Sequence, residues 1–305
     1  HKVSELFMNP ILHINAGVGW SATKPLCYTL ENCGYAHRGS TTECNMLYYI
    51  YERKYKPAHA AYYWMHDYKH RGMDFVKEDT TLNDYIKYIK SHVRPSHKGV
   101  SDFSNSNGDL PAHFLKEISP MLQKYFNVTV SMIFRNPVRR SYSQCSNWYK
   151  HLTDNSNAPA TWRNRDTKKA EEWKKIGEKY DSITFWKTQI SKPSHLCPNY
   201  VSIYKNWTSA FPKVYPLVME EMWGDARERN NFAWFLQQGI GNIHPNVYYP
   251  EMGTRRPEID GLGDQWRSDM QDLTQEDLEE GREKLDWLYQ AWYNEFGSIP
   301  DSWII

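Results

Sequence analysis

The sequence predicts an α/β fold with a central parallel sheet flanked by helices. The run 127–134 (NVTVSMIF) is nearly continuous in residues that favour strands, which is typical of an internal parallel strand. A second apolar run, 11–16, leads through glycines into a helical stretch. Strands that alternate with helices in this way form parallel βαβ units. We expect residues 1–305 to form a single domain.

The other elements follow from local signals. Pro25 suits the first turn of a helix, which is expected to run to about Cys33 with Gly34 as its terminator. Further strands are expected at 34–37, 100–103 and 214–219, and further helices at 43–51, 82–89, 110–125 and 231–238. The charged stretch 150–185 is predicted to be a surface insertion. The irregular stretch 242–272 is predicted to be a mobile loop.

The chain is expected to end in one long helix. Thr274 is a good N-cap residue, and Asp277 stands three residues later, as in a capping box. Gly297 is expected to end the helix. One face of this helix carries Leu278, Leu285, Leu288, Trp292 and Phe296.

The composition argues against two broad classes of function. Lys plus Arg number 37 and Asp plus Glu 36, which gives a net charge of +1. General nucleic-acid and membrane-surface binders usually carry a basic excess. No apolar run approaches the ~18 residues of a membrane span, and no secretory signal peptide is evident. We therefore expect no nucleic-acid partner and no membrane span.

The cysteines point to a reducing compartment. There are five of them, without a CxxC pair, which is too few for a disulfide scaffold in a chain of this length. Reduced thiols and a cytoplasmic location are expected. The alternative is the Golgi lumen, after removal of an N-terminal anchor, with two disulfides and one free thiol.

A candidate anion site lies in the segment 14–25 (INAGVGWSATKP). A glycine-bearing turn that leads into a helix gathers backbone N–H groups in one concavity, and the helix dipole favours negative charge there. Thr23 would add a hydroxyl group and Lys24 a positive charge. The segment does not match the Walker A pattern GxxxxGK[ST]. A tight structural turn is the alternative explanation of its glycines.

A second candidate site is the segment 135–143 (RNPVRRSYS), directly after the strand expected at 127–134. Open α/β sheets bind ligands at the carboxyl ends of their strands, where Arg135 would stand. Pro137 can begin the next helix, which would place Ser143 about a turn and a half into it. A guanidinium and a hydroxyl together suit a phosphate group. The alternative is a helix start with solvated arginines.

These segments resemble motifs of the sulfotransferases that use PAPS (3′-phosphoadenosine 5′-phosphosulfate). The segment 134–144 resembles the family's 3′-phosphate motif, RNPxxRxxS, with Arg135 and Ser143 at the matching spacing. The segment 17–24 is similar to the 5′-phosphosulfate loop, whose common form is PKSGTT. Looser similarities, to the DxSPxY-type and ExxFF-type stretches of the carbohydrate-type members and to a late RKGxxGDW-like loop of cytosolic members, occur at 101–107, 43–48 and 254–266. Together these segments lie between residue 11 and about residue 266.

The resemblance implies a P-loop-like sheet and an in-line transfer of sulfonate from PAPS to a hydroxyl of a carbohydrate or small molecule, without a metal. It assigns Arg135 and Ser143 to the 3′-phosphate. It also suggests that Arg255 and Arg256 lie on a loop that closes over this phosphate; a solvated loop is the alternative. The residues implied for the 5′-phosphosulfate loop are Gly17, Gly19, Trp20, Ser21, Ala22, Thr23 and Lys24.

One departure from the family pattern concerns the charge that stabilises the leaving group. The family usually has Lys or Arg at the position of Trp20. Three possibilities stay open: Lys24 reaches back across the turn, a cation comes from elsewhere, or the protein binds the nucleotide and transfers poorly. For the base that takes the acceptor's proton, the resemblance to carbohydrate-type members implies Glu43. His37 is the alternative, since cytosolic members use an imidazole.

Two other functions remain as alternatives. A small-molecule kinase on a P-loop scaffold would need a Walker A motif, which the sequence lacks, and an acidic ligand for Mg²⁺. A non-catalytic nucleotide- or glycan-binding protein on the same scaffold is suggested by Trp20. His66 and His70 have the i, i+4 spacing of a metal pair but no evident third ligand, so exposed helix histidines explain them better.

Overall fold

The structure is a computed structural model. It describes residues 9–17, 26–27, 30–31, 33–36, 44–58, 60, 75–153, 175, 178–190, 197–222, 235 and 273–304. The chain divides into two compact units, which are described one at a time. The sheet unit comprises His1–Phe134 with Ser202–Tyr249, and the helical unit comprises Arg135–Val201 with Pro250–Ile305. That these units make up a single domain stays a prediction.

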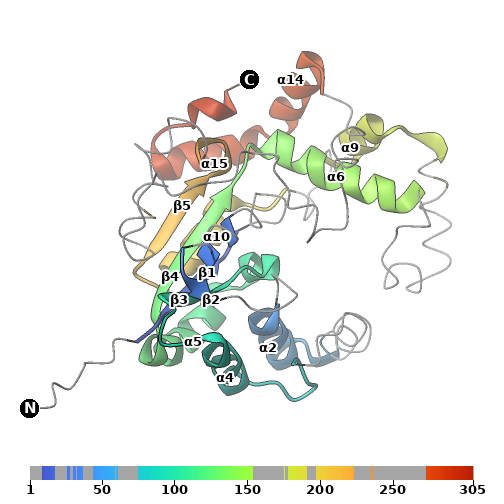
Figure 1. The fold of residues 1–305 in the computed structure, drawn as a ribbon. Coiled ribbons are helices and arrows are strands. Elements are labelled where there is room, and N and C mark those ends of the chain that lie inside the picture. The colour runs from blue at the N-terminus through green and yellow to red at the C-terminus, as the bar shows by residue number, and fades with distance from the viewer. Residues whose placement is uncertain are drawn as a thin grey trace, which may run out of the picture. The chain divides into compact units, whose positions relative to one another are not determined.

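The sheet unit is built on five parallel strands in the order β2-β3-β1-β4-β5 (Figure 1). The strands are β1 (Ile11–Asn15), β2 (Tyr35–Ala36), β3 (Gly99–Asp102), β4 (Asn127–Phe134) and β5 (Val214–Val218). The predicted α/β class with a parallel sheet is thereby confirmed. The 127–134 run is an internal strand, between β1 and β5, as its continuous β-favouring pattern predicted.

Helices of the sheet unit connect these strands. They are α2 (Met46–Tyr55), α4 (Leu82–His92) and α5 (Ala112–Tyr125), with short 3₁₀ turns η2 (Asn105–Asp109) and η3 (Met219–Glu221). The helix α10 (Tyr200–Thr208) runs across the boundary between the two units. Between β1 and β2, Leu26, Cys27, Leu30 and Glu31 are helical, in agreement with the helix expected there. Gly34 has φ +95°, the left-handed conformation that suits glycine after a helix.

The two faces of the sheet differ in polarity, because side chains alternate along each strand. One face carries buried polar residues near its centre: His13, Asn15, Ser101, Thr129 and Ser131. The other face is mostly apolar there, with Leu12, Ile14, Val100, Val130 and Met132, and it carries the buried Asp102 at the end of β3. On the polar face, His13 Nε2 lies 2.8 Å from Ser131 Oγ, and the imidazole contacts the rings of Phe103 and Phe235. Buried polar groups therefore hydrogen-bond to one another across neighbouring strands.

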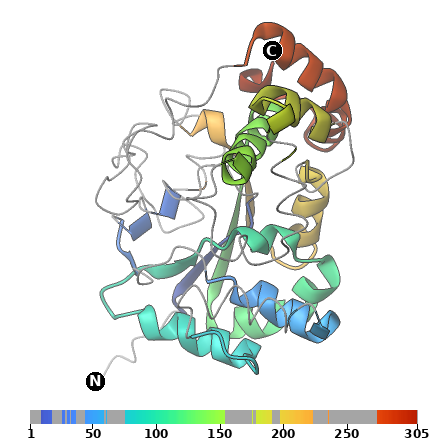
Figure 2. The same cartoon turned by 90° about the vertical axis from the view of Figure 1, so that its right-hand side faces the viewer.

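The helical unit contains α6 (Pro137–Thr153), α9 (Ser182–Ile190), α14 (Gln275–Lys284), α15 (Asp286–Phe296) and the 3₁₀ turn η6 (Asp301–Trp303). The helices α6, α9 and α14 pack against one another (Figure 2). Trp186, at the centre of this packing, is fully buried, and its Nε1 donates a hydrogen bond to Ser141 Oγ over 3.0 Å. Gly281 of α14 lies so close that a Cβ there would stand 2.8 Å from Trp186 Cη2. The close contact of α14 with this indole requires a residue without a side chain.

The ends of the C-terminal segment are as predicted, but its middle is not. Thr274 and Asp277 form a capping box, in which each side chain accepts from the other's backbone N–H, and Gly297 ends the segment at φ +79°. The prediction of one continuous helix is wrong, because α14 and α15 are separated at Leu285 (φ −104°, ψ 11°). There the Leu288 N–H donates to the Leu285 carbonyl, a tighter i→i+3 turn that interrupts the helix.

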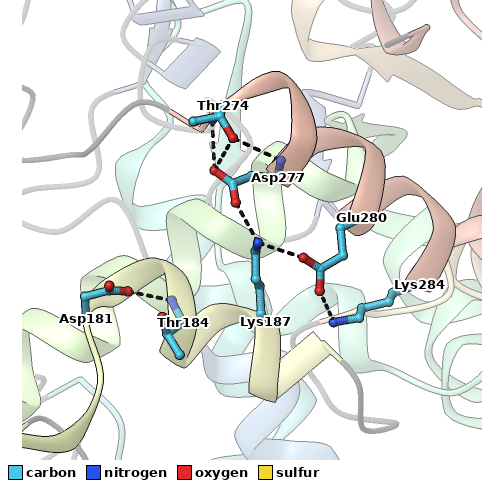
Figure 3. Close-up of polar contacts among 7 residues, drawn as sticks. All are labelled: Asp181, Thr184, Lys187, Thr274, Asp277, Glu280 and Lys284. Carbon is cyan, nitrogen blue, oxygen red and sulfur yellow. Dashed lines mark hydrogen bonds and ion pairs between the residues drawn. The ribbon is translucent and has the colours of Figure 1, made fainter.

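An ion-pair network joins α9 to α14 in the helical unit (Figure 3). Lys187 Nζ lies 2.7 Å from Asp277 Oδ1 and 2.7 Å from Glu280 Oε2. Lys284 is the second cation beside Glu280. Since Asp277 is also the capping-box residue of α14, one carboxylate both starts this helix and holds it against α9.

Three predicted elements lie wholly or mostly outside the described residues: the helix at 231–238, the surface insertion at 150–185 and the loop at 242–272. Within the described parts of the chain, no helix combines the length and the apolar character that crossing a membrane requires.

Candidate functional site

The order of the strands identifies one end of the sheet as the candidate site. From β1 the chain continues to β2, toward one edge of the sheet, and from β4 it continues to β5, at the opposite edge. Open α/β sheets bind ligands beyond the carboxyl ends of two adjacent strands whose connections diverge in this way. The strands β1 and β4 are such a pair, and Asn15 is in register with Ser131 near the ends of the two strands. The segments 17–24 and 135–143 follow directly on β1 and β4.

The start of the loop after β1 is held by the Asn15 side chain. Its Oδ1 accepts a hydrogen bond from the Gly17 N–H over 2.7 Å, and its Nδ2 donates to Ser131 Oγ over 3.3 Å. The Ala16 N–H donates to the Ser131 carbonyl over 2.8 Å. A Cβ on Gly17 would stand 2.6 Å from Asn15 Oδ1. Glycine is required at this position because the Asn15 amide occupies the space of a side chain.

Residues of η2 pack against the turn at Gly17. Asn107 is fully buried, and its carbonyl accepts from Trp207 Nε1 over 3.2 Å. A Cβ on Gly108 would stand 3.2 Å from the Gly17 carbonyl oxygen, closer than most such contacts. The backbone at Gly108 therefore packs closely against the turn at Gly17. The sequence analysis did not single out Asn15, Asn107 and Gly108 as site residues. The available signals were an amide at the end of a strand and the Asn-Gly step at 107–108.

A buried carboxylate joins the end of β3 to the start of α2. Asp102 Oδ1 accepts from the Ser104 N–H (2.9 Å) and hydroxyl (2.5 Å), and Asp102 Oδ2 accepts from the Tyr85 hydroxyl (3.0 Å). Ser104 Oγ in turn accepts from the backbone N–H groups of Cys44 (3.1 Å) and Asn45 (2.8 Å). Asn45 has φ 50°, a left-handed conformation that asparagine tolerates. This arrangement fixes the backbone immediately after residue 43.

In the helical unit, the turn that carries Arg135 is capped by its neighbour. Asn136 is 1% exposed, and its Oδ1 accepts from the N–H groups of Val138 (3.0 Å) and Arg139 (3.2 Å). This is the N-cap of α6, which begins at Pro137 as predicted. Tyr200 donates its hydroxyl to the Arg135 carbonyl over 2.9 Å. Ser143 lies in the second turn of α6.

One face of α6 presents polar groups at helical spacing: Arg140, Ser143, Gln144 and Asn147. Gln144 Oε1 and Asn147 Oδ1 are buried and have no hydrogen-bond partner among the residues that the structure describes. An unsatisfied buried polar atom costs about 1–3 kcal/mol. This face of α6 therefore suits a ligand, or water, that donates hydrogen bonds.

Of the residues that the sequence singled out for the site, the structure describes Gly17, Arg135 and Ser143. Outside the described residues lie Gly19, Trp20, Ser21, Ala22, Thr23, Lys24, His37, Glu43, Arg255 and Arg256. Among the residues described, no group of three His, Cys, Asp or Glu side chains could hold a metal ion. All five cysteines lie in the described parts of the chain, and none forms a disulfide. Burial raises the pKa of the Cys145 thiol to about 12 and that of Cys197 to about 11. Protonated thiols of this kind are poor nucleophiles.

Comparisons with known proteins give a likeness to solved structures but no match to a family model or a curated sequence. Among solved structures, the chain is similar to the crystal structure of a sulfotransferase from Alicyclobacillus acidocaldarius, with a TM-score of 0.49 and 13% sequence identity over 96% of this chain and 98% of that one. With so few identical residues, the function has to be argued from the residues of this chain.

Proposed function

We propose that this protein is a sulfotransferase that moves the sulfonate group of PAPS to a hydroxyl group of a carbohydrate or small molecule. One observation carries the proposal: the RNPxxRxxS-like segment begins directly after β4, the neighbour of β1 where the connections diverge. The glycine loop and the arginine motif therefore follow the two strands at which this kind of sheet binds nucleotides.

The two segments have separate tasks in this proposal. The loop 17–24 holds the 5′-phosphosulfate with its backbone N–H groups, Thr23 and Lys24, and Asn15 fixes where this loop leaves the sheet. Arg135 binds the 3′-phosphate through its planar fork of donors, and Ser143 adds one hydrogen bond. Loop residues Arg255 and Arg256 would close over the same phosphate.

The transfer itself is an in-line displacement. An oxygen of the acceptor attacks the sulfur, and the bond from sulfur to the bridging phosphate oxygen breaks. Adenosine 3′,5′-bisphosphate leaves with the electron pair, and a base takes the acceptor's proton. Positioning and charge stabilisation supply most of the acceleration in such reactions. Glu43 is the base in this proposal, with His37 as the alternative, and a positioned base contributes ~10²–10⁴-fold.

The choice of Glu43 is supported by the hydrogen bonds of the two residues that follow it. Residue 43 directly precedes Cys44 and Asn45, whose backbone N–H groups are held by Ser104 Oγ, and Ser104 is held by the buried Asp102. A base attached to a fixed backbone has less freedom to lose when it reaches the acceptor's hydroxyl.

The proposal is tested first by nucleotide binding. Calorimetry would compare adenosine 3′,5′-bisphosphate with AMP and with ATP·Mg²⁺. We expect a preference for the bisphosphate, and Arg135→Ala should weaken bisphosphate binding by about 10- to 100-fold, since a hydrogen bond to a charged group contributes ~1.5–3 kcal/mol. Arg139→Ala is the matched control, because this side chain is exposed and lies on the same turn. A preference for ATP·Mg²⁺ in the wild type would favour a kinase instead.

Turnover separates an enzyme from a binding protein. The non-catalytic alternative is favoured by Trp20, which stands where the family has a cation. Sulfonate transfer from radiolabelled PAPS to a panel of carbohydrate and phenolic acceptors would be measured for the wild type and for Lys24→Ala. If Lys24 stabilises the leaving group, Lys24→Ala should lower kcat by a larger factor than it lowers the affinity for the bisphosphate. Bisphosphate binding without transfer to any acceptor would support the non-catalytic protein.

A further inference from the structure

We propose that Tyr289, on α15, is a positioning residue for Arg135 and thereby sets the selectivity for a 3′-phosphorylated nucleotide. The inference rests on the proposed function, because it concerns how the 3′-phosphate is recognised. All the residues that carry it belong to the helical unit.

The side chain of Asn136, the residue after Arg135, makes hydrogen bonds with both of its polar atoms. Its Oδ1 accepts not only from the two N–H groups of the α6 cap but also from the Tyr289 hydroxyl, over 3.1 Å. Its Nδ2 donates to the Trp303 carbonyl over 3.4 Å. Asn136 is 1% exposed and Tyr289 is fully buried. The amide plane of Asn136 is therefore held on both edges, by two segments that lie more than a hundred residues away in sequence.

The hydrogen bond from the Tyr289 hydroxyl to Asn136 Oδ1 is not needed to cap α6. An N-cap side chain needs to accept only from one or two N–H groups of the first turn, which Val138 and Arg139 supply. The Tyr289 hydroxyl adds a third donor to the same oxygen. Its function in our inference is to fix the amide, and with it the backbone between Arg135 and Pro137, in one orientation.

The carbonyl of Arg135 is held by a second tyrosine. The Tyr200 hydroxyl donates to the Arg135 carbonyl over 2.9 Å. Tyr289 and Tyr200 therefore hold the backbone after Arg135, at Asn136 and at the Arg135 carbonyl. Tyr289 is itself held in place, because the guanidinium of Arg282 lies 3.6 Å above its ring and the Trp303 ring lies against it.

The position of the Arg135 guanidinium determines how well it can bind a phosphate group. Bidentate recognition of a phosphate by arginine needs the guanidinium in a narrow range of positions. Sites with that requirement depend on neighbouring residues that lock the backbone and the side-chain rotamer. A shift of the Arg135 backbone would weaken contacts to the 3′-phosphate and leave the 5′-phosphate contacts, which other residues make, unchanged.

The test is Tyr289→Phe, which removes the hydroxyl and keeps the ring with its Arg282 and Trp303 contacts. Calorimetry would measure the Kd of adenosine 3′,5′-bisphosphate and of AMP for the wild type and the variant. We expect the affinity for the bisphosphate to fall by about five- to tenfold, as for one lost hydrogen bond, and the affinity for AMP to change by less than about twofold. A merely structural role would lower both affinities together or lower only the melting temperature.

The matched control is Tyr293→Phe, which removes the hydroxyl of an exposed tyrosine one turn later on the same helix. It should leave both affinities unchanged. If Tyr289→Phe does not fold, Tyr200→Phe makes the same comparison at the Arg135 carbonyl. An unchanged ratio of the two affinities in a folded variant would overturn the inference while the proposed function stands. A wild type that does not prefer the bisphosphate over AMP would overturn both.

Discussion

The ammonium of Lys187 on α9 lies 2.7 Å from the carboxylate of Asp277 on α14 (Figure 3). The same ammonium lies 2.7 Å from Glu280, one turn further along α14. The two helices are therefore held together by a single cation that two carboxylates share. The side chain of Asp277 is only 10% exposed, so this carboxylate depends more on Lys187 than a surface residue would.

We expect Lys187→Met to lower the free energy of unfolding by about 1–2 kcal/mol, since it leaves a mostly buried carboxylate without its cation and removes a pair from a network. Lys284→Met is the control. Among the described residues Lys284 pairs within α14, with Glu280, and such i, i+4 pairs contribute ~0.3–0.5 kcal/mol. Urea unfolding of the two variants measures the difference. Equal losses would show that Lys187 contributes no more than an ordinary helix pair.

The same network predicts a dependence of stability on pH. Burial alone would raise the pKa of Asp277, but hydrogen bonds from Lys187 and Thr274 outweigh it and hold that pKa below its usual range. A carboxylate with a lowered pKa in the folded state stabilises the protein above its unfolded pKa, and this contribution is lost as the pH falls through the folded value. We expect wild-type stability to decline below about pH 4.

Asp277→Asn isolates this effect, because an amide does not titrate and keeps the shape of the side chain. The variant should be less stable than the wild type at pH 7, and the gap should narrow between about pH 4 and pH 2. Unfolding midpoints in urea, measured at several pH values for both proteins, provide the comparison. A gap that stays constant with pH would mean that the charge of Asp277 does not stabilise the folded state.

Gly281→Ala is expected to destabilise the protein, although alanine is the better helix former. The intrinsic preference favours alanine by ~1 kcal/mol. The added Cβ, however, would stand 2.8 Å from both Trp186 Cη2 and Val138 Cγ1, and overpacking of this kind costs about 1–3 kcal/mol. We expect thermal unfolding to show a net loss, which Val138→Ala should partly relieve in the double variant. A more stable Gly281→Ala would show that α14 can move away from the indole.

Ser104→Ala tests the polar junction between β3 and α2. The change removes the acceptor of the Cys44 and Asn45 N–H groups and a donor to Asp102, and we expect a loss of about 2–3 kcal/mol in unfolding free energy. Ser106→Ala is the control, since that hydroxyl bonds only the partly buried Asn45 side chain. If Glu43 is the base, Ser104→Ala should also lower kcat by a larger factor than it changes KM. A variant with wild-type kcat would argue against Glu43.

Local sequence signals predicted the positions of the candidate-site residues along the chain but not their distant contacts. Sequence alone placed Arg135 at the end of a strand and Pro137 at the start of a helix, and the structure has both there. It did not predict that Asn136 contacts Tyr289 and Trp303, which are 153 and 167 residues away. No spacing rule links residues so far apart in the chain. Nor did the sequence alone predict that Ser104 Oγ accepts from the N–H groups of Cys44 and Asn45, which stand 60 and 59 residues earlier in the chain.

What the sequence determined by itself are the elements whose stabilising hydrogen bonds are made within a few residues. The capping box of Thr274 and Asp277 and the left-handed Gly297 are of this kind. The strand 127–134 pairs with distant strands, but its β-favouring composition is a local signal and was enough to predict it. Tertiary structure alone decided the order of the strands, the break at Leu285 and the partners of Asn15, Asp102 and Lys187. These features depend on which surfaces meet after the chain has folded, and the free energy of burial and of distant hydrogen bonds, rather than local preference, selects among them.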